Sequence, residues 1–254
     1  MNILEVKDLN MSYKTIDGNV DAVKDVSFTV KQGESFGLVG ESGCGKTSVA
    51  MSLLQLQADN GKITSGEIIF DGQNIVNLSE AELREVRWSG ISIVFQGAMN
   101  SWNPVVKIGE QIREAMREHY PNKTKDENTK KILELFEIVG LEDSIIDRYP
   151  HELSGGMKQR AVIALALSCD PKLIIADEPT TALDVVIQDQ ILNEIRKVPD
   201  VLGLSLIYIS HDIAVIAEMT DNMAVMYAGR IVERGPTKEI FANPKHSYTK
   251  SLLE

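Results

Sequence analysis

Apolar residues follow two different periodicities along the chain. In residues 1–96 and 160–235, short runs of β-branched and aromatic residues stand between turn signals, a pattern typical of β-strands. Two segments within residues 97–159 instead carry apolar side chains at positions i, i+3, i+4 and i+7, the spacing of helices. The predicted strands are 3–9, 22–30, 35–39, 66–72, 91–96, 172–177 and 204–210, with a hairpin at 224–235 that turns at Ala228-Gly229, and the predicted helices are 46–57, 106–119, 129–140, 160–168 and 184–198.

The order of these elements favours an α/β fold. Strands that alternate with helices predict a mostly parallel core sheet, and the stretch 97–159 is then a helical insertion into that domain. At 254 residues, the chain is long enough to bury a large core without disulfides or metal ions. Its two cysteines belong to no metal-binding motif.

Charge and hydropathy exclude several classes of function. The 26 basic and 37 acidic residues give a net charge of −11, which opposes general binding to nucleic acids or anionic bilayers. The longest apolar run, residues 161–167, is far shorter than the ~20 residues of a membrane span. Glu5, Lys7 and Asp8 lie where a secretory signal needs an apolar stretch, so we expect a cytoplasmic protein.

A phosphate-binding loop is predicted between one strand and one helix. The segment from Gly40 to Thr47 fits the pattern G-x-x-x-x-G-K-[ST]. Glycines let backbone amides point at a phosphate, and the helix N-terminus adds partial positive charge. Lys46 is then expected to reach the β- and γ-phosphates, and Thr47 to bind Mg²⁺. The residues expected to bind ATP here are Gly40, Glu41, Ser42, Gly43, Cys44, Gly45, Lys46, Thr47 and Ser48.

A pair of acidic residues supplies the other groups that phosphoryl transfer needs. Four apolar residues predict a buried strand that ends at Asp177, and ligands of open α/β sheets bind at such carboxyl ends. We expect Asp177 to hold Mg²⁺ through its water shell. Glu178 is the candidate general base that activates the attacking water. Alone, the same pattern would indicate only an acidic turn after a strand.

A second anion site is indicated by the segment LSGGMKQ, residues 153–159. Ser154 is a good N-cap, and Gly155 and Gly156 leave the amides of the following helix uncovered. Two anion sites make sense for one nucleotide if two chains face each other. A plain capped helix is the alternative that this segment alone leaves open.

LSGGMKQ resembles the signature motif of ATP-binding cassette (ABC) ATPases, and the other family motifs occur in the family's order. The resemblance extends from Leu4 to about Leu253. By itself, Tyr13, which follows the first predicted strand, could equally cover the core. The further matching residues are Tyr13 as the base-stacking aromatic, Gln96 as the Q-loop glutamine, Ala182-Leu183-Asp184 as the D-loop and His211 as the switch histidine.

The resemblance implies a P-loop NTPase core with a mixed or parallel sheet, an N-terminal antiparallel β subdomain and an inserted helical subdomain. The whole chain, residues 1–254, is then a single nucleotide-binding domain. The expected parts are the core and β subdomain at about 1–96 and 160–235, the helical signature subdomain at about 97–159, and the start of a C-terminal extension at about 236–254.

The resemblance also implies a mechanism with ATP and Mg²⁺ as cofactors. Two subunits close head to tail around two ATP molecules, and hydrolysis releases them. The implied catalytic residues are Glu178, His211 and Gln96, the implied Mg²⁺ residues are Thr47, Gln96 and Asp177, and the residues implied to complete the partner's ATP site are Leu153, Ser154, Gly155, Gly156 and Met157, with Asp184 in the D-loop.

A finer resemblance is to the branch that serves oligopeptide, dipeptide and nickel uptake. The segments that resemble this branch are 95–104, 148–185 and 243–253. It implies an importer ATPase at the cytoplasmic face of the cell membrane. The implied partners are a second ATP-binding subunit, two transmembrane permease subunits and, indirectly, an extracytoplasmic solute-binding protein, with no nucleic acid.

The transported substrate is the least determined point. Peptides are the first expectation, and nickel or oligosaccharides are the alternative within the branch. A soluble ABC ATPase that acts on nucleic acid or ribosomes is a further alternative. A single cassette without sustained heptads, and the net charge of −11, argue against it.

Two expectations concern side chains beside these motifs. Cys44 lies next to Lys46 and just before a helix N-terminus, and both lower the pKa of a thiol, so a reactive cysteine is expected unless its side chain packs inward. The apolar residues after Gln96 either form a groove for a short helix of a membrane partner or pack in the core. They are Met99, Trp102, Pro104 and Val105.

Overall fold

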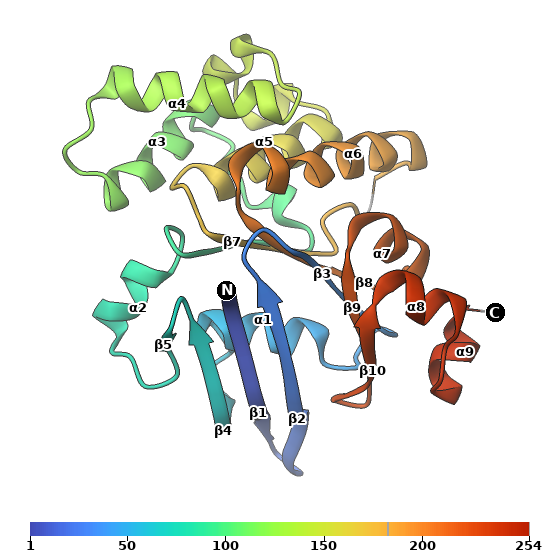
Figure 1. The fold of residues 1–254 in the computed structure, drawn as a ribbon. Coiled ribbons are helices and arrows are strands. Elements are labelled where there is room, and N and C mark those ends of the chain that lie inside the picture. Colours follow the sequence, from blue (N-terminus) through green and yellow to red (C-terminus); the bar gives the residue numbers. More distant parts are fainter. Residues whose placement is uncertain (182, 254) are drawn as a thin grey trace. The chain divides into compact units, whose positions relative to one another are not determined.

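The computed structural model describes residues 1–181 and 183–253, which fall into two compact units. Residues 1–84 and 205–254 make up the first unit, and residues 85–204 the second (Figure 1). Of the expected D-loop, Ala182 lies outside the described residues. The division into a core with an inserted subdomain at 97–159 stays a prediction.

The first unit contains an antiparallel sheet with strand order β2-β1-β4-β5. Strand β1 pairs with β2 on one side and β4 on the other, and Figure 1 shows the three lying side by side. Alternate residues such as Leu4 and Val6 are buried, which is why this segment forms a half-buried strand. The strands are β1 (Asn2–Thr15), β2 (Gly18–Lys31), β4 (Gly61–Phe70) and β5 (Gln73–Asn74).

The same unit contains four strands of a mostly parallel sheet, in the order β10-β9-β3-β8. Strand β3 pairs in parallel with β8 and β9, and β10 returns antiparallel to β9 through the predicted turn at Ala228-Gly229. The strands are β3 (Ser35–Val39), β8 (Ser205–Ser210), β9 (Asn222–Tyr227) and β10 (Arg230–Pro236), and the helices are α1 (Lys46–Leu54), α7 (Ile213–Met219), α8 (Thr237–Ala242) and α9 (Ser247–Leu253).

The second unit places a parallel strand pair beside a group of helices (Figure 1). Its strand β7 is buried at all five positions, as its run of apolar residues predicts. The strands are β6 (Ile91–Val94) and β7 (Leu173–Asp177), and the helices are α3 (Ile108–His119), α4 (Lys125–Ile138), α5 (Gly155–Leu167) and α6 (Val185–Leu202), with α2 (Glu80–Val86) at the boundary of the units. No helix in the described ranges is both long and apolar enough to cross a membrane.

Several boundaries differ from the sequence prediction. Helix α4 begins at Lys125, four residues before the predicted start at 129, because a capping box starts it early. Thr124 accepts from the Glu127 amide, and the Glu127 carboxylate accepts from the Thr124 amide at 2.7 Å. Helices α2, α7, α8 and α9 were not predicted, since their six or seven residues are too short for a helical period to register.

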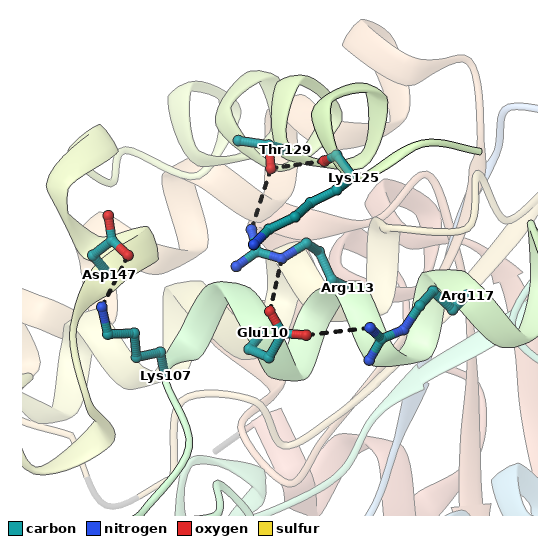
Figure 2. A network of polar contacts seen from close by, with 7 residues as sticks. All are labelled: Lys107, Glu110, Arg113, Arg117, Lys125, Thr129 and Asp147. Atoms are coloured by element: carbon teal, nitrogen blue, oxygen red, sulfur yellow. Dashed lines mark hydrogen bonds and ion pairs between the residues drawn. The ribbon is translucent and has the colours of Figure 1, made fainter.

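A charged network joins helices α3 and α4 (Figure 2). Arg113, only 8% exposed, donates to Glu110 on its own helix at 3.1 Å and to the Thr129 hydroxyl of α4 at 3.3 Å. Arg117 forms a second ion pair with Glu110 at 3.3 Å. At the start of α3, Lys107 binds Asp147 at 3.1 Å. Because Arg113 is buried with its partners in place, the network fixes how these two helices pack.

Candidate nucleotide-binding site

The lysine of the phosphate loop lies inside the turn that precedes it. The side chain of Lys46 is buried at 5% exposure, and its Nζ donates to the carbonyl oxygens of Gly40 at 2.7 Å and Glu41 at 3.0 Å. The loop is therefore wound around an ammonium group. A phosphate oxygen could replace either of these carbonyls as the acceptor for the Lys46 ammonium group.

Helix α1 begins directly from this loop with an open N-terminus. Its N-cap, Gly45, has a φ of 107°, and no side chain among the described residues caps the helix. The first turn contains no acidic residue, and the Thr47 side chain there is exposed. Uncapped amides at the positive end of a helix are the arrangement that binds anions.

His211 lies at the same sheet edge as the phosphate loop. Strands β3 and β8 are parallel, and Val39 is paired with Ser210. Gly40 and His211 are the residues that follow each of these, so both leave the sheet at its carboxyl edge. Asp212 then starts α7, where its carboxylate accepts from the Ala214 amide at 2.8 Å.

Tyr13 connects the antiparallel sheet to helix α1. Its hydroxyl is 3.3 Å from the hydroxyl of Ser48, one residue beyond Thr47. Its ring lies against Gly61, its partner across strands β1 and β4, where a β-carbon would approach the ring to 2.9 Å. Tyr13 is thus held near the phosphate loop, which fits an adenine platform.

Removal of the Tyr13 ring should weaken ATP binding more than catalysis. Stacking of a base on an aromatic ring contributes about 1–3 kcal/mol, and it is present in both ground and transition states. Tyr13→Ala is therefore expected to raise the KM for ATP about tenfold with little change in kcat. Tyr13→Phe keeps the ring and loses only the Ser48 contact, so its KM should stay near wild type in steady-state assays. An unchanged KM in Tyr13→Ala would remove this assignment.

In the second unit, Gln96 and Glu178 come together at the carboxyl ends of β6 and β7. These strands are parallel with Val94 paired to Ala176, so each functional residue lies two positions past the pair. The Gln96 amide donates to Glu178 Oε2 at 3.2 Å. The same oxygen also accepts from the Thr181 hydroxyl at 3.2 Å, a contact that the sequence did not predict.

The backbone changes direction at the end of β7, between Asp177 and Glu178. Asp177 is the last residue of the strand and is buried at 2% exposure. Glu178 has a φ of 45°, a left-handed conformation that is strained for a residue with a side chain. Such strain often occurs at functional sites.

The signature segment and the D-loop each precede a helix of the second unit. Ser154 caps α5 as predicted, and its hydroxyl accepts from the Met157 amide at 3.3 Å. Leu153 is buried, whereas Gly155 and Gly156 form the first turn of the helix. Asp184 caps α6 through the Ile187 amide at 3.0 Å. Both helix starts therefore use a side chain as their N-cap.

The expectation of a reactive Cys44 is wrong. Its side chain packs inward with 7% exposure, and burial raises the pKa of its thiol although Lys46 acts to lower it. The Lys46 ammonium is directed at two carbonyls and lies 3.8 Å from the sulfur. Burial likewise raises the pKa of Cys169 to about 11. Desolvation outweighs the nearby charge at both thiols.

Both thiols should therefore resist alkylation. A maleimide is expected to label Cys44 and Cys169 much more slowly than an exposed thiol near neutral pH, because little thiolate is present and the sulfurs are covered. The labelling rate should rise about tenfold per pH unit, since the pKa values are raised and the thiolate fraction grows until pH reaches them. Mass spectrometry against time measures this. Rapid labelling of Cys44 at neutral pH would contradict the buried position.

The apolar residues after Gln96 divide between core and surface. Trp102 is buried at 7% exposure, and its ring nitrogen donates to the Lys158 carbonyl at 3.3 Å. Val105 is 78% exposed. For Trp102 the core alternative is therefore confirmed, while Val105 is available to a partner.

Three features together are typical of an ABC-type ATPase. They are a phosphate loop at one strand end, an acidic pair at another and a serine-capped signature helix. The comparisons agree: the ABC transporter family profile matches residues 23–181. The chain belongs to the ABC transporter family, and it is an ATP-binding, ATP-hydrolysing subunit of that family.

Similar proteins are found by sequence and by structure. The chain is 45% identical to the dipeptide transport ATP-binding protein DppD of Lactococcus lactis and 46% identical to the oligopeptide transport ATP-binding protein OppD of Bacillus subtilis. Each alignment covers 99% of this chain, with 73% and 71% of the respective relative.

Two solved structures share the fold. The dimeric cassette MJ0796 with ADP and phosphate is 28% identical, with a TM-score of 0.81 over 92% of this chain and 98% of that one. The structure of cbiO1 from Clostridium perfringens, part of the ABC transporter complex cbiONQ, is 30% identical, with a TM-score of 0.82 over 95% of this chain and 91% of that one. The expected α/β cassette fold is thus confirmed.

Proposed function

We propose that this chain energises the import of dipeptides or oligopeptides through an ABC transporter. The observation that carries the substrate class is the identity of 44–46% over nearly the whole chain to relatives named for peptide transport. The chain works at the cytoplasmic face of the membrane with two permease subunits, a second ATP-binding subunit and an external solute-binding protein.

Within the first unit, the phosphate loop holds the nucleotide. Lys46 exchanges its carbonyl partners for the β- and γ-phosphates, and the uncapped amides of α1 bind the remaining oxygens. Tyr13 stacks on the adenine. His211, which leaves the sheet beside the loop, contacts the γ-phosphate and stabilises the charge that develops there.

Each of the residues proposed to hold Mg²⁺ carries an oxygen donor. This ion prefers hard oxygen donors. The donors here are the exposed hydroxyl of Thr47, the amide oxygen of Gln96 and the carboxylate of Asp177, which acts through water. When bound, Mg²⁺ would supply positive charge to the phosphates. Glu178, held by Gln96 and Thr181, is positioned to accept a proton from the attacking water.

The signature segment of the second unit, residues 153–157, serves the nucleotide of another subunit. Two chains close head to tail, so that Ser154 and the glycines after it reach the γ-phosphate bound by the partner chain. The Ser154 hydroxyl accepts from the Met157 amide at 3.3 Å, and its own O–H can be donated to that phosphate. Asp184 lies at the start of α6 in the same interface. Closure requires the γ-phosphate, so hydrolysis opens the pair.

Growth of an amino-acid auxotroph tests the substrate class. Deletion of the gene should abolish growth when the required amino acid is supplied as a di- or oligopeptide and leave growth on the free amino acid intact. A copy that encodes Lys46→Ala should fail to restore growth, whereas the wild-type copy should restore it. Unimpaired growth on peptides, with loss of nickel or oligosaccharide uptake instead, would overturn the peptide assignment.

A further inference from the structure

The C-terminal segment 243–253 has no part in the mechanism described above, yet it contacts the phosphate loop. Its helix α9 belongs to the same compact unit as that loop. The hydroxyl of Tyr248 accepts a hydrogen bond from the backbone N–H of Glu41 at 3.1 Å, across 207 positions of sequence. A side chain near the end of the chain thus holds a peptide of the nucleotide site.

The start of helix α9, where Tyr248 lies, is attached to strands β9 and β10. The Tyr248 ring packs against Tyr227, the last residue of β9, with a centroid distance of 4.6 Å. The carboxylate of Glu233 in β10 accepts from the backbone amides of Lys245 at 2.8 Å and His246 at 3.0 Å. These contacts fix the hydroxyl to β9 and to the edge strand β10, so its position does not depend on nucleotide.

The peptide group that Tyr248 binds also contacts Lys46, because its carbonyl, that of Gly40, accepts from Lys46 Nζ at 2.7 Å. Glu41 donates its N–H to Tyr248, and its carbonyl accepts from Lys46 Nζ at 3.0 Å and from the Cys44 amide at 3.2 Å. A second tie comes from the hairpin turn, where the Gly229 amide donates to the Cys44 carbonyl at 2.9 Å. The loop is therefore held from outside at two points, and one of them is a side chain that can be changed without altering the loop itself.

We propose that Tyr248 is a positioning residue of the nucleotide site: it holds the Glu41 peptide in place, so that the phosphate loop is ordered before it binds. The inference rests on the proposed binding of phosphates by this loop. A loop that is already ordered loses less conformational freedom on binding and so binds more tightly.

The test is Tyr248→Phe in the full chain, with MgADP as the probe. The variant keeps the ring against Tyr227 and loses the acceptor for the Glu41 amide. We expect the Kd for MgADP and the KM for ATP to rise about two- to tenfold, the fold-change that corresponds to one hydrogen bond. The kcat at saturating ATP should stay near wild type, because Tyr248 touches no reacting atom.

Hydrogen exchange gives a local readout of the same bond. Exchange in residues 40–44 should be faster in Tyr248→Phe, while the remaining strands of the first unit keep their protection. Tyr227→Phe is the matched control, because it removes a neighbouring phenol hydroxyl and leaves the bond to Glu41 in place. It should bind MgADP as the wild type does, with unchanged exchange in the loop.

Three outcomes would overturn the proposal. Wild-type affinity and wild-type exchange in Tyr248→Phe would show that the bond does not order the loop. Faster exchange throughout the first unit would show a general loss of structure instead of a positioning role. Lys46→Ala distinguishes failure of the positioning role of Tyr248 from failure of the proposed function. If Lys46→Ala also binds MgADP normally, the loop is not the nucleotide site, and the proposed function fails as well.

Discussion

ATP turnover in Glu178→Gln is expected to fall by at least about 100-fold, since a general base contributes about 10² to 10⁴ in rate. The substitution removes the charge and keeps the shape, so the amide can still meet Gln96 and Thr181, which bind Glu178 Oε2 at 3.2 Å each. Nucleotide binding should survive, because Lys46 and Asp177 carry it. Phosphate release against time, with MgATP binding by calorimetry, measures both quantities.

The matched control for this variant is Glu134→Gln, an exposed glutamate on α4 in the same unit. It also removes one negative charge, and its turnover should equal that of the wild type. Normal turnover in Glu178→Gln would show that another group takes the proton from water. Loss of MgATP binding in Glu178→Gln would show that this carboxylate acts in binding.

Gly45→Ala is expected to destroy the phosphate loop. The φ of Gly45 is 107°, and a β-carbon there would overlap the carbonyl oxygen of Ala22 in β2, a backbone atom that cannot turn aside. Backbone strain costs about 1–3 kcal/mol and overpacking a similar amount. We expect a loss of at least about 2 kcal/mol in the free energy of unfolding, together with loss of MgATP binding.

A second glycine of the same loop supplies the comparison for this prediction. Gly43 has a φ of 82° with open space where its β-carbon would be. Gly43→Ala therefore bears the strain alone and should lose about 1 kcal/mol. Denaturant unfolding of the two variants gives the difference. Equal stabilities would show that the contact with Ala22 is relieved by a small shift of the loop.

Much of the fold could be predicted because its signals are local. The four inner residues of β8, 206–209, form a run of apolar and aromatic side chains, and all six residues of the strand are buried, as such a run predicts. The turn at Ala228-Gly229 and the N-caps Ser154 and Asp184 likewise depend on residues close in sequence. The phosphate loop is predictable for the same reason, since its pattern, its strand and its helix are contiguous.

What could not be predicted depends on contacts between distant residues. The pKa of Cys44 follows from how the loop packs, and its neighbours in sequence suggested the opposite direction. The bond from Glu41 to Tyr248 joins residues that no local pattern relates. Short helices such as α7 form where an N-cap, here Asp212, and packing decide, and a single turn or two shows no period.

Head-to-tail closure around ATP is the central claim, and the molar mass of Glu178→Gln by light scattering after size exclusion tests it most directly. The measurement is made on the chain alone and on the chain mixed with the second ATP-binding subunit of its transporter. A pair should form with MgATP, with about twice the mass of the 28.1 kDa chain if the two subunits are identical, and it should dissociate with MgADP. Addition of Ser154→Arg should abolish the pair, because the bulky charge enters the facing site. A double variant that still pairs with MgATP would contradict the account.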